Sequence, residues 1–331
     1  LITSALPYIN GVKHLGNLVG SMLPSDVYSR YLRSAGHEVL FICATDEHGT
    51  PAELAALEAG QDVAEYCAEQ HEVQKDLCER FELSFDWFGR TSAPQNHDLT
   101  NHFARRLRAE GFCEIRSTAQ VYSVADGRFL PDRYVEGRCV KCGNENSRSD
   151  QCDKCGTTFE VGEIADPTCI TCRSRPEMRT TKHYFFKLTD FERPLLSYVQ
   201  GSKHWRSNVQ LFTQNWLESG LKDRAMTRDM SWGVPVPLPG SEGKVIYVWF
   251  EAVIGYLSAS IEWAHNRGTP DAWQDWWYDP EAQIYNFIGK DNIPFHTVIW
   301  PAELLAVGQF YCDDCETGLN LPYDVPANEY L

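Results

Sequence analysis

The sequence lacks segments that would cross a membrane or direct secretion. None of its apolar runs approaches the roughly 18 residues that a membrane-spanning helix needs. The first residues, Leu1 to Ser4, contain no charged region followed by a cleavage site, which argues against a secretory signal peptide. We therefore expect a cytoplasmic protein that does not contact membranes. An initiator methionine is also absent, so the sequence is expected to be part of a longer chain.

Positive charge is also scarce in this sequence. Its 331 residues include 30 Lys and Arg against 46 Asp and Glu, which gives a net charge of −16. Because nucleic-acid coats need clustered Lys and Arg to neutralise phosphates, this balance argues against a general nucleic-acid-binding protein. It does not exclude an enzyme that binds one RNA end through a small basic surface.

Cysteine, in contrast, is frequent. Eight of the twelve cysteines form four Cys-x-x-Cys pairs: Cys139/Cys142, Cys152/Cys155, Cys169/Cys172 and Cys312/Cys315. Without a secretion signal, such pairs predict metal binding in a reducing compartment rather than disulfides. The single cysteines, Cys43, Cys67, Cys78 and Cys113, are expected to be small buried hydrophobic residues.

The first third of the chain predicts an α/β domain. Apolar runs and turn signals predict, in order, a strand at 1–8, a helix at 14–35, a strand at 37–44, and helices at 51–82 and 96–110. Strands that alternate with helices in this way indicate a doubly wound parallel sheet, a Rossmann-like fold.

A turn-rich segment then interrupts the pattern and carries the first three Cys-x-x-Cys pairs. Beyond it we expect a strand at 244–247, a helix at 251–267, a strand at 283–289, a helix at 294–305 and a loop at 318–331. The predicted domains are therefore the first catalytic half at 1–110, an inserted zinc-knuckle connective domain at 111–226, and the second catalytic half at 227–331.

Candidate phosphate-binding residues follow the first predicted strand. Asn10-Gly11 is a turn signal, and His14 and Gly16 fall in the first turn of the helix after it. Unpaired backbone N–H groups at a helix start suit phosphate. His14 can donate a hydrogen bond as charge builds on a phosphate oxygen. Alone, His-x-Gly-x is a weak motif, for which a purely structural role would be favoured.

The surrounding residues strengthen this motif. Ala5-Leu6-Pro7-Tyr8, Asn10-Gly11 and His14-Leu15-Gly16-Asn17 together resemble the first signature of class I aminoacyl-tRNA synthetases, in the form that methionyl-tRNA synthetases have. The family usually has a second His where Asn17 stands. Asn still donates an N–H but cannot be cationic, so we expect a weaker phosphate contact.

Three further segments resemble the same family: Thr45-Asp46-Glu47-His48-Gly49-Thr50, Tyr247 to Tyr256, and Phe287 to Asp291 with His296 and Trp300. They follow in the family's order over the whole chain. The family usually has Pro where Val253 stands. Its Lys-rich second signature, Lys-Met-Ser-Lys-Ser, does not occur before Leu331.

The resemblance implies an amino-acid site for methionine. Asp46 follows a predicted strand, at the edge where parallel sheets bind ligands, and would hold the ammonium group. Aromatic edges suit a thioether, although core packing is the alternative for each aromatic residue. The implied methionine-binding residues are Ala5, Leu6, Tyr8, Asp46, Trp249, Ala252, Val253, Tyr256, His296 and Trp300.

The resemblance also implies methionine–tRNA ligase activity, which activates L-methionine with ATP and transfers it to the 3′ end of tRNA(Met). Such a reaction needs no covalent protein nucleophile, so the protein positions reactants and stabilises phosphate charge. His14, Asn17 and Lys290 would be catalytic, with Mg²⁺ bridging the phosphates. The implied ATP-binding residues are His14, Gly16, Asn17, Gly289 and Asp291.

The inserted segment predicts a structural metal centre. Cys139-x2-Cys142-x9-Cys152-x2-Cys155 can place four thiolates around Zn²⁺ in a closed site. In the resembling family this domain helps to seat the tRNA acceptor end. Cys169/Cys172 are expected to be a vestigial half site, with Asp126 as a third ligand of a second zinc as the alternative. For Cys312/Cys315 the sequence leaves three alternatives open: a loop insertion, pairing with Cys169/Cys172, or no metal binding.

Two rival functions remain open from the sequence. A simple nucleotidyltransferase shares the His-x-Gly-x helix but needs neither a zinc insertion nor a Trp-rich pocket. A zinc-ribbon nucleic-acid-binding protein is opposed by the charge of −16 and by the two α/β halves. Pyrophosphate exchange across amino acids separates these functions from methionine activation.

Overall fold

The structure is a computed structural model that describes residues 1–11, 15–131, 134–149, 152, 154–155, 163–308 and 318–329. Its main body is built on a five-stranded sheet with the strand order β14-β13-β1-β2-β3. Every neighbouring pair in this sheet is parallel. The strands are β1 (Ile2–Ser4), β2 (Phe41–Thr45), β3 (Trp87–Arg90), β13 (Tyr285–Gly289) and β14 (Ala327–Asn328).

The first strand lies in the middle of the sheet. Ile2 pairs with Phe41 of β2 on one side and with Tyr285 of β13 on the other. The chain therefore builds one half of the sheet before residue 91 and the other half after residue 284, which confirms the predicted doubly wound α/β fold.

Both faces of the sheet are covered. Phe41 joins a cluster with Ile2 and Phe287, against which residues of α2 (Leu23–Ser34) pack. Its neighbour Ile42 joins the largest core with residues of α5 (Pro94–Ala109), α9 (Ile254–Asn266) and α11 (Trp300–Val307). Successive side chains of a strand point to opposite faces, so a five-residue apolar strand such as β2 is buried throughout.

The predicted helices are present, but several of them are divided into shorter elements. The helix predicted at 51–82 is two helices, α3 (Thr50–Ala59) and α4 (Val63–Arg80). Gly60 ends α3 in a left-handed conformation with φ 67°, and the Asp62 side chain caps α4 by accepting from the N–H groups of Ala64 and Glu65. The first helical segment comprises α1 (Leu15–Asn17), the π-helical turn η1 (Leu18–Met22) and α2.

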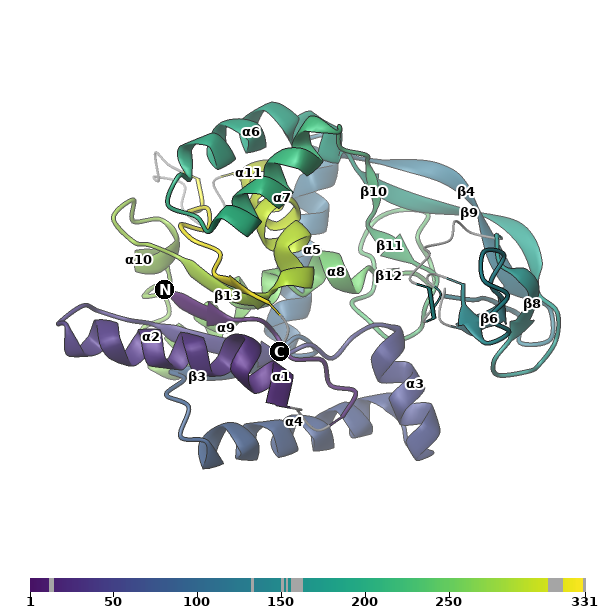
Figure 1. The fold of residues 1–331 in the computed structure, drawn as a ribbon, viewed down its shortest axis with the longest axis horizontal. Helices are drawn as coiled ribbons and strands as arrows, with labels where there is room; N and C mark the ends of the chain where they lie inside the picture. Colours follow the sequence, from purple (N-terminus) through teal and green to yellow (C-terminus); the bar gives the residue numbers. More distant parts are fainter. Residues whose placement is uncertain are drawn as a thin grey trace.

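The segment after α5 forms an arm that leaves the main body, toward the right of Figure 1. Its long strands β4 (Cys113–Ser123) and β9 (Glu177–Phe186) pair antiparallel from Cys113↔Phe186 to Tyr122↔Glu177. At the far end lies a small sheet with the order β7-β6-β8, formed by β6 (Val135–Arg138), β7 (Ser147–Arg148) and β8 (Ala165–Cys169). A separate small core that includes Tyr134 and Ile164 supports this module.

Two helices within the predicted insertion pack elsewhere. The helices α6 (Glu192–Gly201) and α7 (Ser207–Glu218) bury Leu195 and Val209 in the largest core of the main body. They lie above the sheet in Figure 1, beside α11. The range 111–226 therefore contains two packing environments, and its use as a domain boundary stays a prediction.

The remaining elements connect these parts. Two strands of the main sheet were not predicted from the sequence, β3 and β14; β14 lies in a segment that was expected to be a loop. The other elements are β5 (Arg128–Phe129), η3 (Leu188–Phe191), β10 (Arg224–Ala225), β11 (Thr227–Arg228), β12 (Val245–Ile246), α8 (Val248–Glu251), α10 (Gln274–Trp277), η4 (Lys290–Asn292) and η5 (Phe295–Ile299). Within the described ranges, no helix is long and apolar enough to span a bilayer.

Candidate active site and metal centres

The predicted amino-acid site lies at the carboxyl edge of the main sheet. After β1 the chain stays beside the end of β2, because the Asp46 N–H donates to the Pro7 carbonyl and the Ile9 N–H donates to the Asp46 carbonyl, both at 2.9 Å. These bonds place Tyr8 directly beside Asp46 in an isolated parallel bridge. Asp46 is 4% exposed, so its carboxylate is largely shielded from bulk water.

Tyr256 and His296 form a buried polar pair. The Tyr256 hydroxyl lies 2.8 Å from Nε2 of His296, and Nδ1 of His296 lies 2.9 Å from the Asn292 carbonyl. Burial lowers the pKa of His296 to about 4, so the ring is neutral near pH 7. Because a carbonyl only accepts, Nδ1 carries the proton and Nε2 accepts from Tyr256. The Tyr256 oxygen therefore keeps lone-pair capacity for a positively charged partner.

Aromatic rings form the wall next to Tyr8. The Tyr8 ring meets Trp249 edge-on at 5.8 Å, and Trp249 stacks on Phe295 at 4.0 Å between ring centroids. Phe295 was not among the predicted residues, since it lies outside the quoted motif positions. Packing explains why the motif has glycine at position 255. A Cβ on Gly255 would lie only 2.9 Å from Leu6 Cδ2. The absence of a side chain lets α9 approach the segment after β1.

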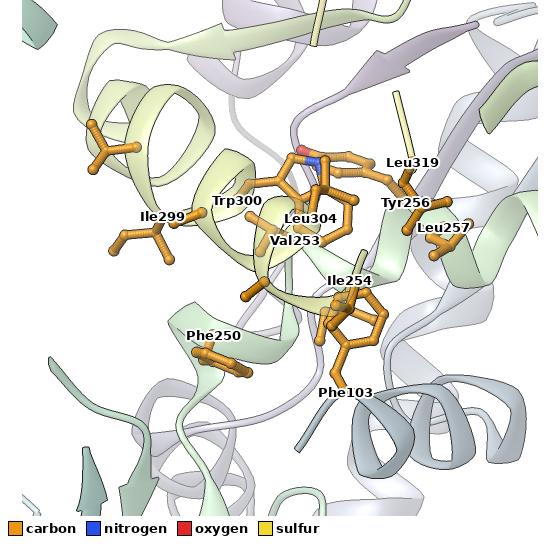
Figure 2. Packing of buried hydrophobic residues seen from close by; sticks show 14 of the residues in the cluster. Phe103, Phe250, Val253, Ile254, Tyr256, Leu257, Ile299, Trp300, Leu304 and Leu319 are labelled. Carbon is orange, nitrogen blue, oxygen red and sulfur yellow. The ribbon is translucent and has the colours of Figure 1, made fainter. Parts of the chain in front are cut away.

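Three other predicted pocket residues are buried in the hydrophobic core. Trp300 is fully buried, stacks near Phe103 at 6.1 Å and meets Trp277 edge-on at 6.0 Å. Figure 2 shows Trp300 and Val253 within this cluster. Ala252 is also buried. Their roles as pocket walls remain predictions, and core packing accounts for their burial.

A cavity of about 420 Å³ opens beside the site, which lies in the size range of small-molecule pockets. Tyr8 and Trp249 line it together with Gly49, Arg228 and Asp229. The Arg228 guanidinium lies 3.7 Å above the centre of the Tyr247 ring. The cavity therefore combines aromatic walls with charged groups between the main body and the arm.

The predicted ATP-binding residues lie around the ends of β1 and β13. Asn17 ends α1, and the following turn η1 is tied to β14 because Asn328 Nδ2 donates to the Gly20 carbonyl at 2.7 Å. Gly289 ends β13, and Asp291 follows it in η4. Lys290 donates to Glu329 Oε2 at 2.7 Å, which raises the pKa of Lys290. Gly16 is exposed, and His14 lies outside the described residues.

A buried carboxylate beside Asp46 was missed by the sequence reasoning. Glu47 accepts from Arg90 Nε and Nη2 at 2.9 and 2.8 Å and from Thr45 Oγ1 at 2.7 Å. Ser92 also donates to it. A fully buried carboxylate with this many donors holds the end of β2 in place. The signal was present, because Glu47 belongs to the quoted motif.

A second missed network joins two of the motifs. His48 Nδ1 lies 2.9 Å from Glu251 Oε1, and Asn96 Nδ2 donates to Glu251 Oε2 at 2.9 Å. Glu251 is fully buried at the end of α8, the helix that carries Trp249. This hydrogen bond therefore holds the segment after β2 against the segment at 247–256 in the fold.

The four predicted zinc ligands converge. The sulfur atoms of Cys139, Cys142, Cys152 and Cys155 all lie within 4.8 Å of one another. Cys139 Sγ is 3.8 Å from Cys155 Sγ, and Cys142 Sγ is 3.7 Å from Cys152 Sγ. Thiolates about 2.3 Å from a central Zn²⁺ would lie about 3.8 Å apart in a tetrahedron. The spacing therefore fits a four-coordinate metal site.

A second cluster has a backbone turn like that of the four-cysteine site, but its candidate metal ligands differ. Cys139 N–H donates to Asn144 O at 2.8 Å, and Cys169 N–H donates to Ser174 O at 2.9 Å. Arg173 adopts φ 57°, where the first turn has Gly143 at φ 73°. Side chains of Asp126, Cys169 and Cys172 lie within 4.8 Å of one another.

The candidate metal ligands of this second cluster already form hydrogen bonds with each other and with Ser123. Cys169 Sγ donates to Asp126 Oδ2 at 3.3 Å, and Ser123 Oγ lies 3.3 Å from Cys172 Sγ. Cys312 and Cys315, which the sequence left unassigned, lie outside the described residues. The cluster thus keeps the turn of a zinc knuckle, while only two of its donors are thiols.

Known proteins match this chain over nearly all of its length. A family model described as tRNA synthetases class I (M) matches residues 1–331. Methionine–tRNA ligase 1 of Acaryochloris marina is 51% identical over 307 residues, which are 92% of this chain and 55% of that protein. Methionine–tRNA ligase of Streptomyces avermitilis is 51% identical over an alignment of 319 residues; the match covers 93% of this chain and 56% of that protein.

Solved structures show the same fold. The crystal structure of Mycobacterium tuberculosis methionyl-tRNA synthetase bound by methionyl-adenylate superposes with a TM-score of 0.72 and 25% sequence identity. The match covers 99% of this chain and 57% of that chain. This chain spans about half the length of the curated relatives it matches, 55% and 56% of the two named above. The match over all 331 residues shows that the chain belongs to the family tRNA synthetases class I (M).

Proposed function

We propose that this chain is the catalytic part of a methionine–tRNA ligase, which activates L-methionine with ATP and transfers it to the 3′ end of tRNA(Met). The observation that carries the proposal is the position of Asp46 beside Tyr8, at the carboxyl edge of the sheet. The Tyr8 ring contacts Trp249, and both rings line a cavity. Family membership and the names of the relatives support it.

The proposed amino-acid site uses one charge and several rings. Asp46 would pair with the substrate ammonium, and the Tyr256 oxygen, whose proton is directed to His296, would accept a second hydrogen bond. Tyr8 and Trp249 would contact the thioether, which favours aromatic edges. A neutral His296 suits this role, because a cation beside the substrate ammonium would repel it.

The proposed reaction has two steps. The methionine carboxylate attacks the α-phosphorus of ATP, and pyrophosphate leaves; a ribose hydroxyl of the tRNA end then takes the acyl group, and AMP leaves. His14, Gly16, Asn17, Gly289, Lys290 and Asp291 are the candidate ATP-binding residues. When bound with ATP, Mg²⁺ would neutralise phosphate charge. Asn17 and Lys290 would donate hydrogen bonds to phosphate oxygens as charge develops there.

The remaining assignments are structural. Zn²⁺ is the proposed ion of the four-cysteine site, and we favour a vestigial half site at Asp126, Cys169 and Cys172. The described cysteines form no disulfide, which supports the proposed cytoplasmic location. We keep the ranges 1–110, 111–226 and 227–331 as the proposed catalytic half, connective insertion and second catalytic half.

Pyrophosphate exchange in the presence of each amino acid tests the proposed function. Exchange that depends on methionine alone is the expected result. Exchange without any amino acid would indicate a simple nucleotidyltransferase. If the whole protein supports no exchange with methionine, the proposal is wrong.

A further inference from the structure

A second cavity adjoins the candidate active site. It has a volume of about 540 Å³, and its lining includes Phe186, Phe212, Trp216, Tyr247, Trp249 and Phe295. Ala225, Arg228, Tyr247 and Trp249 also line the first cavity, so the two spaces share one wall. A group bound in the second cavity would therefore lie next to the proposed methionine site, because Trp249 belongs to both.

The chemistry of this cavity differs from that of a gap in a hydrophobic core. Phe212 is 44% exposed, so part of the aromatic wall faces solvent. The Arg224 guanidinium lies 5.7 Å from the centre of the Trp216 ring, and the Arg228 guanidinium stacks on Tyr247. Flat rings with guanidinium groups at the rim suit a nucleobase that stacks and a phosphate that carries charge.

The one carboxylate in the lining is already paired. Asp223 accepts from Arg116, and its other oxygen accepts from the Thr189 hydroxyl at 2.8 Å. Hydrogen bonds from Arg116 and Thr189 outweigh its partial burial and lower the pKa of Asp223. The two arginines at the rim therefore act as a local positive surface in a chain whose net charge is −16.

We propose that this cavity receives the terminal adenosine of the tRNA 3′ end during acyl transfer. The inference rests on the proposed function. Asn17 and Gly289, the candidates for ATP, are not among the residues that line the cavity, and neither is Asp46. Phe212 and Trp216 instead come from α7, which follows the arm in the chain.

The geometry fits the second step of the reaction. With the adenine between the α7 rings and Trp249, the attached ribose would point to the wall that both cavities share. A ribose hydroxyl oxygen forms the new ester bond with the acyl carbon of methionyl-adenylate. The bond from that carbon to the phosphate oxygen breaks, AMP leaves with the electron pair, and the hydroxyl proton passes to the AMP phosphate or to solvent.

The test compares two assays on Phe212→Ala and Trp216→Ala variants of the whole protein. Methionine-dependent pyrophosphate exchange should keep its kcat and KM, because neither side chain would touch methionine or ATP. Single-turnover transfer from preformed adenylate to tRNA should slow about 5- to 150-fold, the usual loss for one stacked base. Leu211→Ala is the matched control, since Leu211 is exposed on the same helix and does not line the cavity.

A tRNA without its terminal adenosine gives a second measurement. Wild-type protein should bind it more weakly than complete tRNA, whereas Trp216→Ala should bind both equally. Trp216→Phe keeps a ring and should restore the difference, even if the alanine variant folds poorly.

Three results would overturn the proposal. An unchanged transfer rate in both alanine variants would show that the cavity does not bind the terminal adenosine during transfer. A raised methionine KM in exchange would assign the cavity to the amino-acid site. An equal loss for complete and shortened tRNA would show a structural role. Failure of the wild type to support exchange would instead contradict the proposed function, so the two failures are distinct.

Discussion

The Tyr134 hydroxyl donates a hydrogen bond of 3.0 Å to Oε2 of Glu53, which joins the metal-bearing module to α3 of the main body. The other oxygen of Glu53 accepts from the Ser231 hydroxyl and from the Trp232 N–H, both at 3.1 Å. The Trp232 indole then donates to the Glu47 carbonyl at 2.6 Å. A continuous hydrogen-bond network thus connects Tyr134 of the module with Glu47, the residue next to Asp46.

We expect Tyr134→Phe to weaken the attachment of the arm. It removes one hydrogen bond of a buried hydroxyl, worth about 1 kcal/mol, and leaves Glu53 bound to Ser231 and Trp232. Aminoacylation should therefore fall while the methionine KM in exchange stays the same. Glu53→Ala also releases Trp232, so it should raise that KM. If the two variants give the same pattern, Glu53 does not position the loop that contains Trp232.

Replacing Asp46 by Asn should separate binding from folding. Loss of one charged hydrogen bond should raise the methionine KM about 10- to 150-fold, with little change in the midpoint of thermal unfolding. Asp62→Ala is the matched control: it removes the cap of α4, lowers stability by about 1 kcal/mol and leaves KM unaltered. A wild-type KM in Asp46→Asn would refute the ammonium role.

His296 should make stability depend on pH in the acid range. Its folded-state pKa is lowered from 6.5 to about 4, so the unfolded chain binds the proton more readily between these values. Stability from this residue is present above pH 6.5 and is lost as pH falls through 4, by about 3 kcal/mol in total. His296→Gln should flatten this part of the curve. A wild-type slope between pH 4 and 6.5 in that variant would place the titration elsewhere.

Metal analysis separates the two cysteine clusters. The wild type should contain one zinc per chain, and Cys139→Ser should lose it and loosen the small core around Tyr134, because structural zinc contributes folding free energy. Cys169→Ser should leave the zinc content unchanged if the second cluster is vestigial. Two zinc ions in the wild type, with one lost in Asp126→Asn, would establish Asp126 as a ligand instead.

Glu303 should destabilise the core at neutral pH. It is fully buried on α11, and no described residue donates a hydrogen bond to either of its carboxylate oxygens. Burial raises its pKa well above the ordinary value. The folded state keeps the proton longer than the unfolded chain, so stability falls as pH rises above the unfolded pKa, by up to about 1.4 kcal/mol per pH unit.

Glu303→Met keeps the volume and removes the titrating group, so it should raise the unfolding midpoint more at pH 8 than at pH 5. Leu305→Met is a control on the same helix, because Leu305 is 38% exposed. An equal gain at both pH values would show that packing, and not the carboxyl group, sets the difference.

The sequence predicted the elements that carry motifs better than those that do not. β2 and α9 were recognisable because apolar runs mark them, and Asp46 because it ends β2. β3 and β14 contain four and two residues, too few for a periodic pattern. Trp300 shows the other limit: sequence position near the site cannot tell a pocket wall from a core residue that packs on Phe103.

Bonds between distant residues were also beyond the sequence. The partners His48 and Glu251 are 203 positions apart, and nothing in either motif names the other. Glu47 was visible as a charged residue, yet its burial depends on Arg90, which the missed strand β3 supplies. The four-cysteine site was predictable because its ligand spacing reflects the two turns that form it.

The central place of β1 has a consequence for the order of synthesis. β1 is synthesised before the other strands of its sheet, yet the Thr3 hydroxyl donates to Asn286 of β13, which is 283 positions later. At about 5–20 residues per second, β1 waits roughly 15–60 s with one edge open. Of the two strands that flank β1 in the described sheet, β2 is made early and β13 is still missing during that time. The nascent chain therefore exposes an apolar strand edge, and a chaperone that binds such edges would act on this protein before its second half exists.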